Sequence, residues 1–474
     1  MTALFDFRQT FLRKHLAHEL TRTAEVLALE ELNKIEGTRH LTLRDFFYGG
    51  LPEDAMLYIP VRVLPLGDDL RDLPALYFKK RSPYGLRPTF DLSYALAALR
   101  HFDIPGGIYL RSRSGAGKTV AGLAAMCDCF YGTEVADTPS ATPRLGGFLP
   151  CRLRTGSVFK GVRDRFARFK SDGKRQDWLH QQVAAVGSEL IERMLLATAG
   201  LAGKGQSRLL PGWMNAGPPL LIFVDLNAFG EVERRLTAAA LVKFQEESAS
   251  AGAGHRVVVT YRSATLDSVH AALAGCRLLH PFDLEPLPPG QAAEYLRTYR
   301  RLAARRAGTA VSDAALDQEA AALRQFIDDH VTGEESLVST PLLMHLVTLI
   351  PGAELREGKV RTLSDLYDRV VHRFFVQDFL KTIPDETPQR FKDQTTGDPE
   401  SYFVTAMCRV ALAILASGET TRLIGSGNLS ATKVLHQLWG EPKESRLWSG
   451  GGYALNMMLN VTCTNAVHTD VCVL

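Results

Sequence analysis

The sequence predicts an α/β protein whose core is a parallel sheet of five strands, and three features of the chain carry that prediction. A short apolar run at 108–110 precedes a loop of Ser, Arg and Gly and then a helical segment that starts at 119. A longer apolar run at 219–225 has the composition of a parallel strand that is buried on both faces. Apolar runs and helical patterns alternate through the middle of the chain, as a parallel sheet with crossover helices requires.

Five apolar segments are the expected strands of this sheet. They span residues 108–110, 148–153, 219–225, 257–262 and 278–284. The helical patterns that precede or connect them span residues 91–101, 119–126, 158–200 and 231–247. A further extended segment, 57–64, contains Pro60, which has no N–H to donate to a neighbouring strand, so it is expected at an edge.

Helical patterns dominate the two ends of the chain. Residues 1–36 carry apolar side chains at a spacing of three to four without a proline, which predicts a helix. This helix could promote oligomerisation or belong to an effector segment, but packing on the next domain is the favoured interpretation. After Pro289, helices are expected at 291–306, 314–330, 363–380, 401–416 and 431–439, and one more opens at 339–344.

Bulk composition limits the classes of protein to consider. A chain of 474 residues exceeds one ordinary core, and its length favours about three domains. Its 55 Lys and Arg nearly balance its 52 Asp and Glu, so electrostatics alone gives no reason to expect a nucleic-acid or membrane surface. No apolar run approaches the roughly 18 residues of a membrane-spanning helix, so no membrane partner is expected.

The seven cysteines favour a reducing compartment. Cys127 and Cys129 stand two apart, but no second pair follows at the spacing of a zinc site. Two thiols in the core are therefore favoured over a metal site, and the expected localisation is cytoplasmic.

The motif that carries chemistry is the loop SRSGAGKT at 112–119. A strand, a Gly-rich loop and an opening helix form the context of a phosphate-binding loop, in which backbone N–H groups and the helix N-terminus surround phosphate oxygens. Lys118 would reach the β- and γ-phosphates, and the Thr119 hydroxyl would bind Mg²⁺. The expected nucleotide-binding residues of this loop are Ser112, Ser114, Gly115, Ala116, Gly117, Lys118, Thr119 and Val120.

The loop departs from the usual motif at its first position, where Ser112 stands in place of Gly. A serine adopts a positive φ less readily than a glycine does. The competing interpretation is an ordinary Gly-Lys-Thr turn that enters a helix, and the strand before the loop argues against it.

Two further candidates end predicted strands. Asp225 closes the apolar run at 219–225, at the edge where ligands of open α/β sheets bind, so it is expected to hold Mg²⁺ directly or through water. The alternative is an aspartate that only caps the following turn. Arg262 ends the strand at 257–262 and could sense the γ-phosphate. Lys118, Asp225 and Arg262 are therefore the expected catalytic residues.

Five segments in this order resemble the NACHT class of STAND ATPases, the bacterial relatives of animal NOD-like receptors. Two of them are the loop SRSGAGKT and the strand LLIFVD at 220–225. The other three are VVVTYR at 257–262, which is similar to the sensor motif of the family, LEPLPPGQAAEYL at 284–296, and TPLLMHLVTLI at 340–350 taken with LSDLYDRVVHRFF at 363–375. The resemblance covers roughly residues 90–380.

The resemblance implies a domain order. It places an N-terminal region of unknown role at 1–90, a P-loop NTPase domain at 91–288, a helical domain at 289–355 and a winged-helix-like region at 356–474. Members of the family normally continue into a repeat or sensor domain, so a truncated product and a short form with a separate sensor both stay open.

The resemblance also implies a nucleotide-dependent switch. ADP would be held at rest, with Pro341 against the base, and exchange for Mg²⁺-bound ATP would open the protein for self-association. The trigger would be an unknown protein or nucleic acid, and prokaryotic antiviral defence is one expected setting.

One departure bears on catalysis. The family usually shows an acidic pair soon after its first aspartate, whereas this chain has Ala228 and Phe229 there. Without a carboxylate to orient the attacking water, slow or absent hydrolysis is expected, although Glu231 could substitute. Two other functions stay open: an AAA+-like ATPase that remodels nucleic acid or protein, and a scaffold that binds nucleotide without hydrolysing it.

Overall fold

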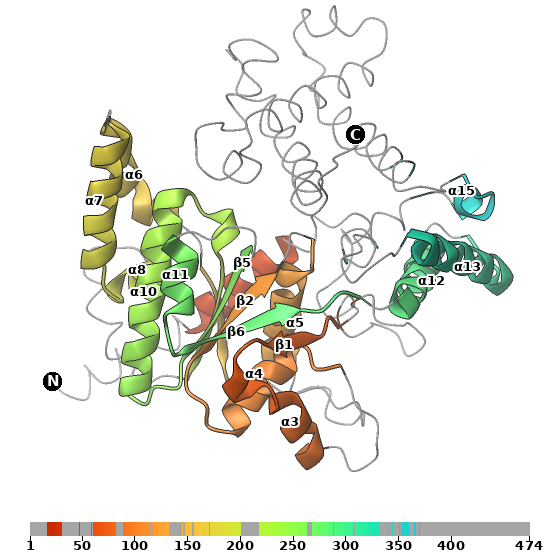
Figure 1. Ribbon diagram of the computed structural model, residues 1–474, viewed down its shortest axis with the longest axis horizontal. Coiled ribbons are helices and arrows are strands. Elements are labelled where there is room, and N and C mark those ends of the chain that lie inside the picture. The colour runs from red at the N-terminus through yellow and green to blue at the C-terminus, as the bar shows by residue number, and fades with distance from the viewer. Residues whose placement is uncertain are drawn as a thin grey trace, which may run out of the picture. The chain divides into compact units, whose positions relative to one another are not determined.

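The computed structural model describes two compact units of the chain (Figure 1). The first comprises Met1–Ser112 and Gly117–Pro286, and the second comprises Arg113–Ala116 and Leu287–Leu474. Within them, the described residues are 17–30, 60–81, 89–112, 115–131, 147–153, 156–169, 171–200, 218–262, 268–287, 289–306, 309–330 and 352–359, with single positions at 47, 58, 145, 341, 344, 350, 365 and 369.

The first unit is built on a six-stranded mixed sheet with the order β1-β6-β2-β5-β4-β3. Its strands are β1 (Val63–Pro65), β2 (Gly107–Ser112), β3 (Leu149–Arg152), β4 (Leu220–Asp225), β5 (Arg256–Arg262) and β6 (Leu279–Leu284). All five predicted strands form, and they pair in parallel. The α/β class of the sequence-based prediction is therefore confirmed.

The sixth strand corrects the prediction of a purely parallel, five-stranded sheet. β1 lies antiparallel to β6 at the edge of the sheet and overlaps the end of the segment at 57–64 that was expected at an edge. Backbone hydrogen bonds extend this pairing, from the Glu285 N–H to the Arg62 carbonyl and from the Leu66 N–H to the Pro281 carbonyl. Because these partners stand more than 200 residues apart in the chain, no local pattern could reveal the pairing.

Helices cover both faces of the sheet (Figure 1). One face carries α4 (Leu92–His101) and α5 (Lys118–Tyr131), and the other carries α8 (Glu189–Thr198), α10 (Glu231–Ser250) and α11 (Ser268–Ala274). A Cβ at Gly122 of α5 would lie 3.5 Å from the Phe223 ring, which places that ring on the α5 face. α4 and α10 confirm the helices predicted at 91–101 and 231–247.

Smaller elements complete the first unit. Before the sheet lie η1 (Asp68–Leu70) and α3 (Leu73–Arg81), and between β3 and β4 lie η2 (Gly156–Phe159), α6 (Lys160–Arg168) and α7 (Asp172–Ala185). Together with α8, these last helices confirm the predicted helical stretch at 158–200. The short η3 (Leu226–Ala228) follows β4 directly.

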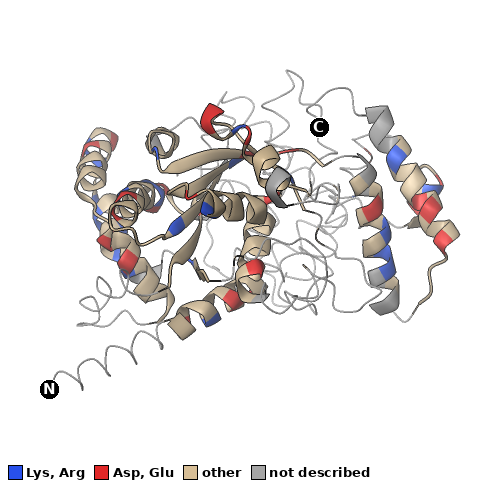
Figure 2. Ribbon diagram, turned by 90° about the horizontal axis from the view of Figure 1, so that it is seen from below, with Lys and Arg blue, Asp and Glu red and all other residues tan. Residues whose placement is uncertain are grey.

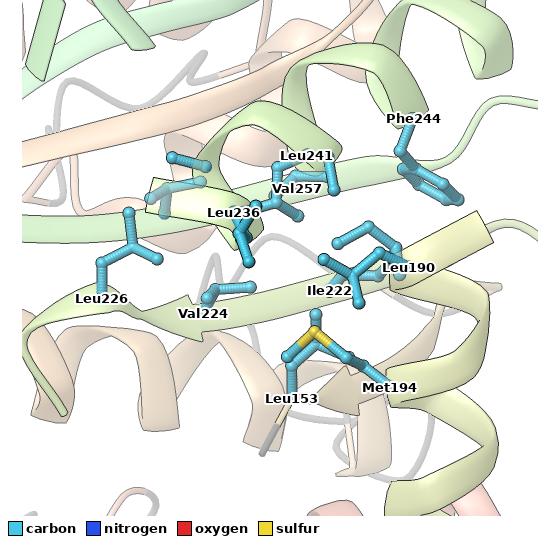
Figure 3. Packing of buried hydrophobic residues seen from close by; sticks show 14 of the residues in the cluster. Leu153, Leu190, Met194, Ile222, Val224, Leu226, Leu236, Leu241, Phe244 and Val257 are labelled. Carbon is cyan, nitrogen blue, oxygen red and sulfur yellow. The ribbon is translucent and has the colours of Figure 1, made fainter. Parts of the chain in front are cut away.

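A hydrophobic cluster of buried residues fills the space between the sheet and α8, α10 and α11 (Figure 3). Alternate residues of β4 point into it, including Ile222 and Val224, and they meet Met194 of α8 and Leu241 of α10. Because Leu221 and Phe223 are buried but lie outside this cluster, β4 is covered on both sides, as its continuous apolar run predicts.

Of the helix predicted at 1–36, residues 17–30 belong to the described part of the chain, and they are helical. Leu20, Ala24, Leu27 and Ala28 are buried at the spacing of one helical face. Leu20 belongs to the cluster above, and the Arg152 guanidinium donates to the Leu27 carbonyl at 3.3 Å. This helix therefore packs on the sheet-containing unit, as the favoured interpretation expected. Residues 1–16 and 31–36 lie outside the described part.

A pair of buried carboxyl groups lies beside α4. Asp91 is the N-cap of this helix and accepts a hydrogen bond from the Tyr94 N–H at 3.1 Å. Burial raises the pKa of Asp91 from its ordinary value of 3.8 to about 7, and the charge of Asp128 on α5 adds to the rise. The folded protein therefore binds a proton at Asp91 at pH values where the unfolded chain has lost it.

Replacing Asp91 is expected to make the protein more stable at alkaline pH. The stabilising contribution of the Asp91 proton is complete below about pH 4 and is lost as the pH rises through about 7. Asp91→Asn keeps an oxygen for the helix cap and removes the buried charge, so the free energy of unfolding at about pH 8 should rise by up to about 4 kcal/mol.

Urea denaturation of both proteins at about pH 5 and about pH 8 tests this expectation. Asp177→Asn, at an exposed position of α7, is the matched control and should change little at either pH. Asp91 would not be a buried proton site if Asp91→Asn lost the same stability at both pH values.

The second unit contains the helices α12 (Pro289–Arg306), α13 (Asp313–His330) and α15 (Gly352–Arg356). Glu319 of α13 is only 4% exposed and accepts from the Arg300 guanidinium at 3.0 Å and from Arg356. A Cβ at Gly352 would lie 2.0 Å from the Glu319 carboxylate, so a larger residue there would displace this carboxylate from its present position. This buried ion group joins the three helices.

The arginines of α12 are paired with acidic residues of α13, and Figure 2 shows both charge signs on these helices. Arg297 donates to Asp317 at 2.7 Å, and Arg301 donates to Asp313 at 2.8 Å. The helix pattern predicted at 291–306 and 314–330 is confirmed, and its basic residues serve helix packing at these positions.

The remaining predicted elements fall mostly outside the described part of the chain. These are the helices expected at 363–380, 401–416 and 431–439 and the winged-helix-like region at 356–474. The helix expected to open at 339–344 is described only at Pro341 and Met344, which are both helical. Over the described residues, no helix is long and apolar enough to cross a membrane.

Candidate functional site

The strand order creates a switch point at the carboxyl edge of the sheet. From β2 the chain passes through α5 to β3 at the far edge, whereas from β5 it passes through α11 to β6 on the other side of β2. The connections therefore leave the adjacent strands β2 and β5 in opposite directions. Ligands of open α/β sheets bind in the crevice at such a point.

Ser112 at the end of β2 and residues 117–119 at the start of α5 lie at this switch point. Gly115 and Gly117 have φ values of +78° and +90°, a region that favours glycine. α5 begins at Lys118, and the Ala121 N–H donates to the Gly117 carbonyl at 2.8 Å. No acidic residue stands in the first turn of α5, so its N-terminal dipole has no side-chain carboxylate of its own to satisfy it.

The Lys118 ammonium is turned back toward the start of the loop. Its Nζ donates to the Ser112 carbonyl at 2.7 Å, and the residue is only 8% exposed. A buried ammonium needs anionic or carbonyl partners, because burying its charge alone costs several kcal/mol. The position of Lys118 therefore gives the loop a strong attraction for an anion.

Ser112 does not take the strained backbone that the sequence suggested. It is the last residue of β2 and pairs in register with Arg262 of β5, so its backbone is extended. Among the described residues other than glycine, only Asp103 has a positive φ. The missing glycine at this position is therefore compatible with the loop, because the positive φ values fall on Gly115 and Gly117.

Thr119 and Asp225 face each other across β5. The Thr119 Oγ1 lies 3.5 Å from one carboxylate oxygen of Asp225, which is at the limit of a hydrogen bond. The other oxygen accepts from the backbone N–H of Asn227 at 3.0 Å and from its side chain at 2.9 Å. Asp225 thus caps the turn after β4 with one oxygen and directs the second toward Thr119.

β5 contributes a buried hydroxyl between these groups. Thr260 pairs in register with Leu110 of β2 and Asp225 of β4, and it is 5% exposed. Its Oγ1 has no hydrogen-bond partner among the described residues. An unsatisfied buried hydroxyl is costly, so it indicates a missing polar partner at this edge. The backbone of Arg262 ends β5 beside Ser112, and its side chain lies outside the described part.

The turn after Asp225 is anchored in the hydrophobic core. Leu226 is fully buried and Phe229 is 6% exposed, and both belong to the cluster beneath α10. Of the two positions where the family usually has an acidic pair, Ala228 lies in the short η3 and Phe229 packs in the core. Neither Ala228 nor Phe229 supplies a carboxylate.

Glu231, the substitute considered for that pair, is held by other partners. Its Oε1 accepts from the Gln176 side chain of α7 at 3.3 Å and lies 3.9 Å from the Arg235 guanidinium. Glu233 folds back over Gly230, where a Cβ would lie 2.4 Å from its carboxylate, and pairs with Arg163 at 3.3 Å. These carboxylates stabilise the start of α10 and its contacts with the α6–α7 region.

One residue of the site was not foreseen. Asp283 of β6 pairs in register with Arg111 of β2, and the Ser112 hydroxyl and the charges of Arg111 and Lys118 act on its carboxyl group. Burial outweighs them and raises the pKa of Asp283 above its ordinary value. A signal was present, because Asp283 is the last residue but one of the predicted strand at 278–284, close to the strand end as Asp225 is in β4.

Of the remaining predicted residues, the structure describes some and not others. Gly115, Ala116 and Val120 are half-buried in the loop and the first turn of α5, whereas Ser114 lies outside the described part. Pro341 is half-buried and helical in the second unit.

The two neighbouring cysteines lie on α5 and not at the loop. Cys127 is fully buried, and Cys129 is half-buried and donates to the Ala125 carbonyl at 3.4 Å. Burial raises the pKa of both thiols, so they stay neutral in the core. Among the described residues, no three Asp, Glu, His or Cys side chains form a metal-binding group.

The residues at the switch point fit a nucleotide phosphate and a magnesium ion. Thr119 and Asp225 supply hard oxygen ligands of the kind that Mg²⁺ prefers, and their spacing of 3.5 Å is below the roughly 4.2 Å limit for two oxygens on one ion. Lys118 and the N-terminus of α5 supply the positive charge for phosphate, and Thr260 supplies a hydroxyl that needs a partner.

The site and the fold together define an α/β protein with a polar, phosphate-compatible loop at the switch point of a mixed sheet. In comparisons with known proteins, no family model matches the chain, and no curated protein matches it significantly.

Proposed function

We propose that this chain binds an adenine nucleotide with Mg²⁺ at the carboxyl edge of its sheet, as a P-loop NTPase does. The observation that carries the proposal is the convergence of Lys118, Thr119 and Asp225 at the switch point, after a turn with two glycines of positive φ. Two separate parts of the chain meet there, the loop at the start of α5 and the end of β4.

The residues have separate roles in this proposal. Backbone N–H groups of the loop and the N-terminus of α5 receive the phosphates, and Lys118 leaves the Ser112 carbonyl to contact the terminal phosphates. Thr119 and the second oxygen of Asp225 hold Mg²⁺, which neutralises phosphate charge when bound. Thr260 would contact the last phosphate through its buried hydroxyl, and Arg262, which ends β5 beside Ser112, would do so as the sequence-based prediction expects.

We further propose that the bound nucleotide acts as a switch and is hydrolysed slowly or not at all. The support is the packing of Phe229 and Leu226 in the core and the engagement of Glu231 by Gln176, which leave these positions unable to orient water. The family resemblance extends the proposal to exchange of ADP for ATP, self-association and a protein or nucleic-acid trigger in the cytoplasm, with Pro341 against the base.

Two other functions compete with the switch. An AAA+-like remodeller would need rapid turnover, which the positions after Asp225 do not favour. A scaffold that binds nucleotide for stability would share the site but would not change its oligomeric state on exchange. Sedimentation of the full chain with ADP and with ATP, with and without candidate triggers, separates the scaffold from the switch.

The magnesium part of the proposal predicts a specific loss in Asp225→Asn. The asparagine keeps an acceptor for the Asn227 N–H but removes the negative charge that would hold the ion. We expect Mg²⁺ to increase the nucleotide affinity of the natural protein. In the variant, this Mg²⁺-dependent increase in affinity should be about tenfold smaller.

Calorimetric titration with ADP, in Mg²⁺ and in EDTA, gives the result. Asp164→Asn, on the exposed face of α6, is the control and should respond to Mg²⁺ as the natural protein does. An unchanged Mg²⁺ response in Asp225→Asn would show that Asp225 only caps its turn.

A further inference from the structure

Asp283 lies among the positive groups of the proposed nucleotide site. β6 neighbours β2 along their whole length, and Asp283 stands opposite Arg111, one residue before the loop begins. One of its oxygens accepts from the Leu284 N–H at 2.8 Å. Burial raises the pKa of this carboxyl group, whereas the charges of Arg111 and Lys118 and the Ser112 hydroxyl each act to lower it.

Ser112 links these charges to the start of the loop. Its carbonyl accepts from Lys118 at 2.7 Å, and Arg111, the residue before it, stands opposite Asp283 in the strand register. Ser112 and Lys118 are buried, whereas Asp283 is half-buried.

We infer that Asp283 is a negative charge built into the phosphate site, where it competes with the nucleotide for Lys118 and Arg111 and thereby weakens nucleotide binding. The inference rests on the proposed nucleotide site and adds a determinant of its affinity. Like charges in one partly buried site repel strongly because water screens them little. A site of this kind releases its nucleotide more readily, which suits exchange.

The groups around Asp283 decide how this charge behaves. β2 supplies Arg111 and Ser112, α5 supplies Lys118, and on β1 the residue opposite is the uncharged Leu64. The cations and the hydroxyl favour the carboxylate form, whereas burial opposes it and has the larger effect. The charge therefore appears at higher pH than for an exposed aspartate, and nucleotide binding should weaken as it appears.

The test compares three variants of the full-length chain by titration with a fluorescent ADP. Asp283→Asn should bind about tenfold more tightly than the natural protein at about pH 8, and the difference should shrink as the pH is lowered and in high salt. Glu285→Gln is the matched control, because Glu285 lies two residues away at the same strand end and pairs with the exposed Arg62.

Ser112→Ala separates a charge effect from a positioning effect. If Asp283 served to hold the loop through Ser112, both Ser112→Ala and Asp283→Asn would weaken binding, and that result would overturn the inference. Equal affinity of Asp283→Asn and the natural protein would overturn it as well.

Failure of the nucleotide proposal has a different signature. If the folded natural protein bound neither ADP nor ATP, both proposals would fall together. If it bound nucleotide, lost binding in Lys118→Ala and was indifferent to Asp283→Asn, the site would stand and only the role of Asp283 would fail.

Discussion

Lys118→Ala is expected to lower the affinity of the protein for ADP and ATP by about a hundredfold or more. Charge-assisted hydrogen bonds to phosphate are worth roughly 1.5–3 kcal/mol each, and a lysine at this loop position reaches two phosphates. The buried ammonium now turned toward the Ser112 carbonyl is the group that would make these bonds. Isothermal titration of the purified chain with each nucleotide measures the loss.

Two controls keep that result interpretable. Lys174→Ala removes a lysine from an exposed position of α7 and should leave nucleotide affinity unchanged. Circular dichroism of Lys118→Ala should match that of the natural protein, because the substitution shortens one side chain at the start of α5 and leaves the backbone of the helix able to form. Nucleotide binding of normal strength by a folded Lys118→Ala would show that the loop is not the phosphate site.

The second large effect concerns turnover. We expect the natural protein to hydrolyse ATP more slowly than about 0.1 per second, although enzymes of this kind reach 1 per second and more. The physical reason is the turn after Asp225, where Leu226 and Phe229 are packed in the core and Glu231 is bound to Gln176. No carboxylate at these positions is available to orient the attacking water.

Release of phosphate from saturating MgATP measures this rate, and Lys118→Ala supplies the background. The decisive contrary result would be a turnover of about ten per second or more that disappears in Lys118→Ala. The protein would then be a rapid ATPase that orients water with a residue outside the turn at 226–231. An AAA+-like remodelling function would become the better interpretation.

Much of the sheet could be predicted because each of its parallel strands corresponds to a short apolar run in the sequence. The run from Leu220 to Asp225 is apolar at five successive positions, which only a strand covered on both faces explains well, and the structure covers it with α5 and α10. The glycines of the loop were also predictable, since Gly115 and Gly117 take the positive φ that their motif requires.

The contacts that tune the site were not predictable, because they join residues that are distant in the chain. Asp283 stands opposite Arg111 only because β6 returns to lie beside β2, and no local spacing records that return. The antiparallel β1 depends on a similar long-range pairing. Phe229 is buried in the core at a position where the family usually has a carboxylate. A single aromatic residue after a strand does not show whether its side chain is buried, so this packing could not be predicted.

The most direct test of the central claim is to identify what the purified full-length chain carries. Denaturing the protein after purification in Mg²⁺ and separating the supernatant by ion-exchange chromatography should show close to one adenine nucleotide per chain, and little from Lys118→Ala. An empty natural protein that also gives no heat of binding with millimolar MgADP or MgATP would contradict the account.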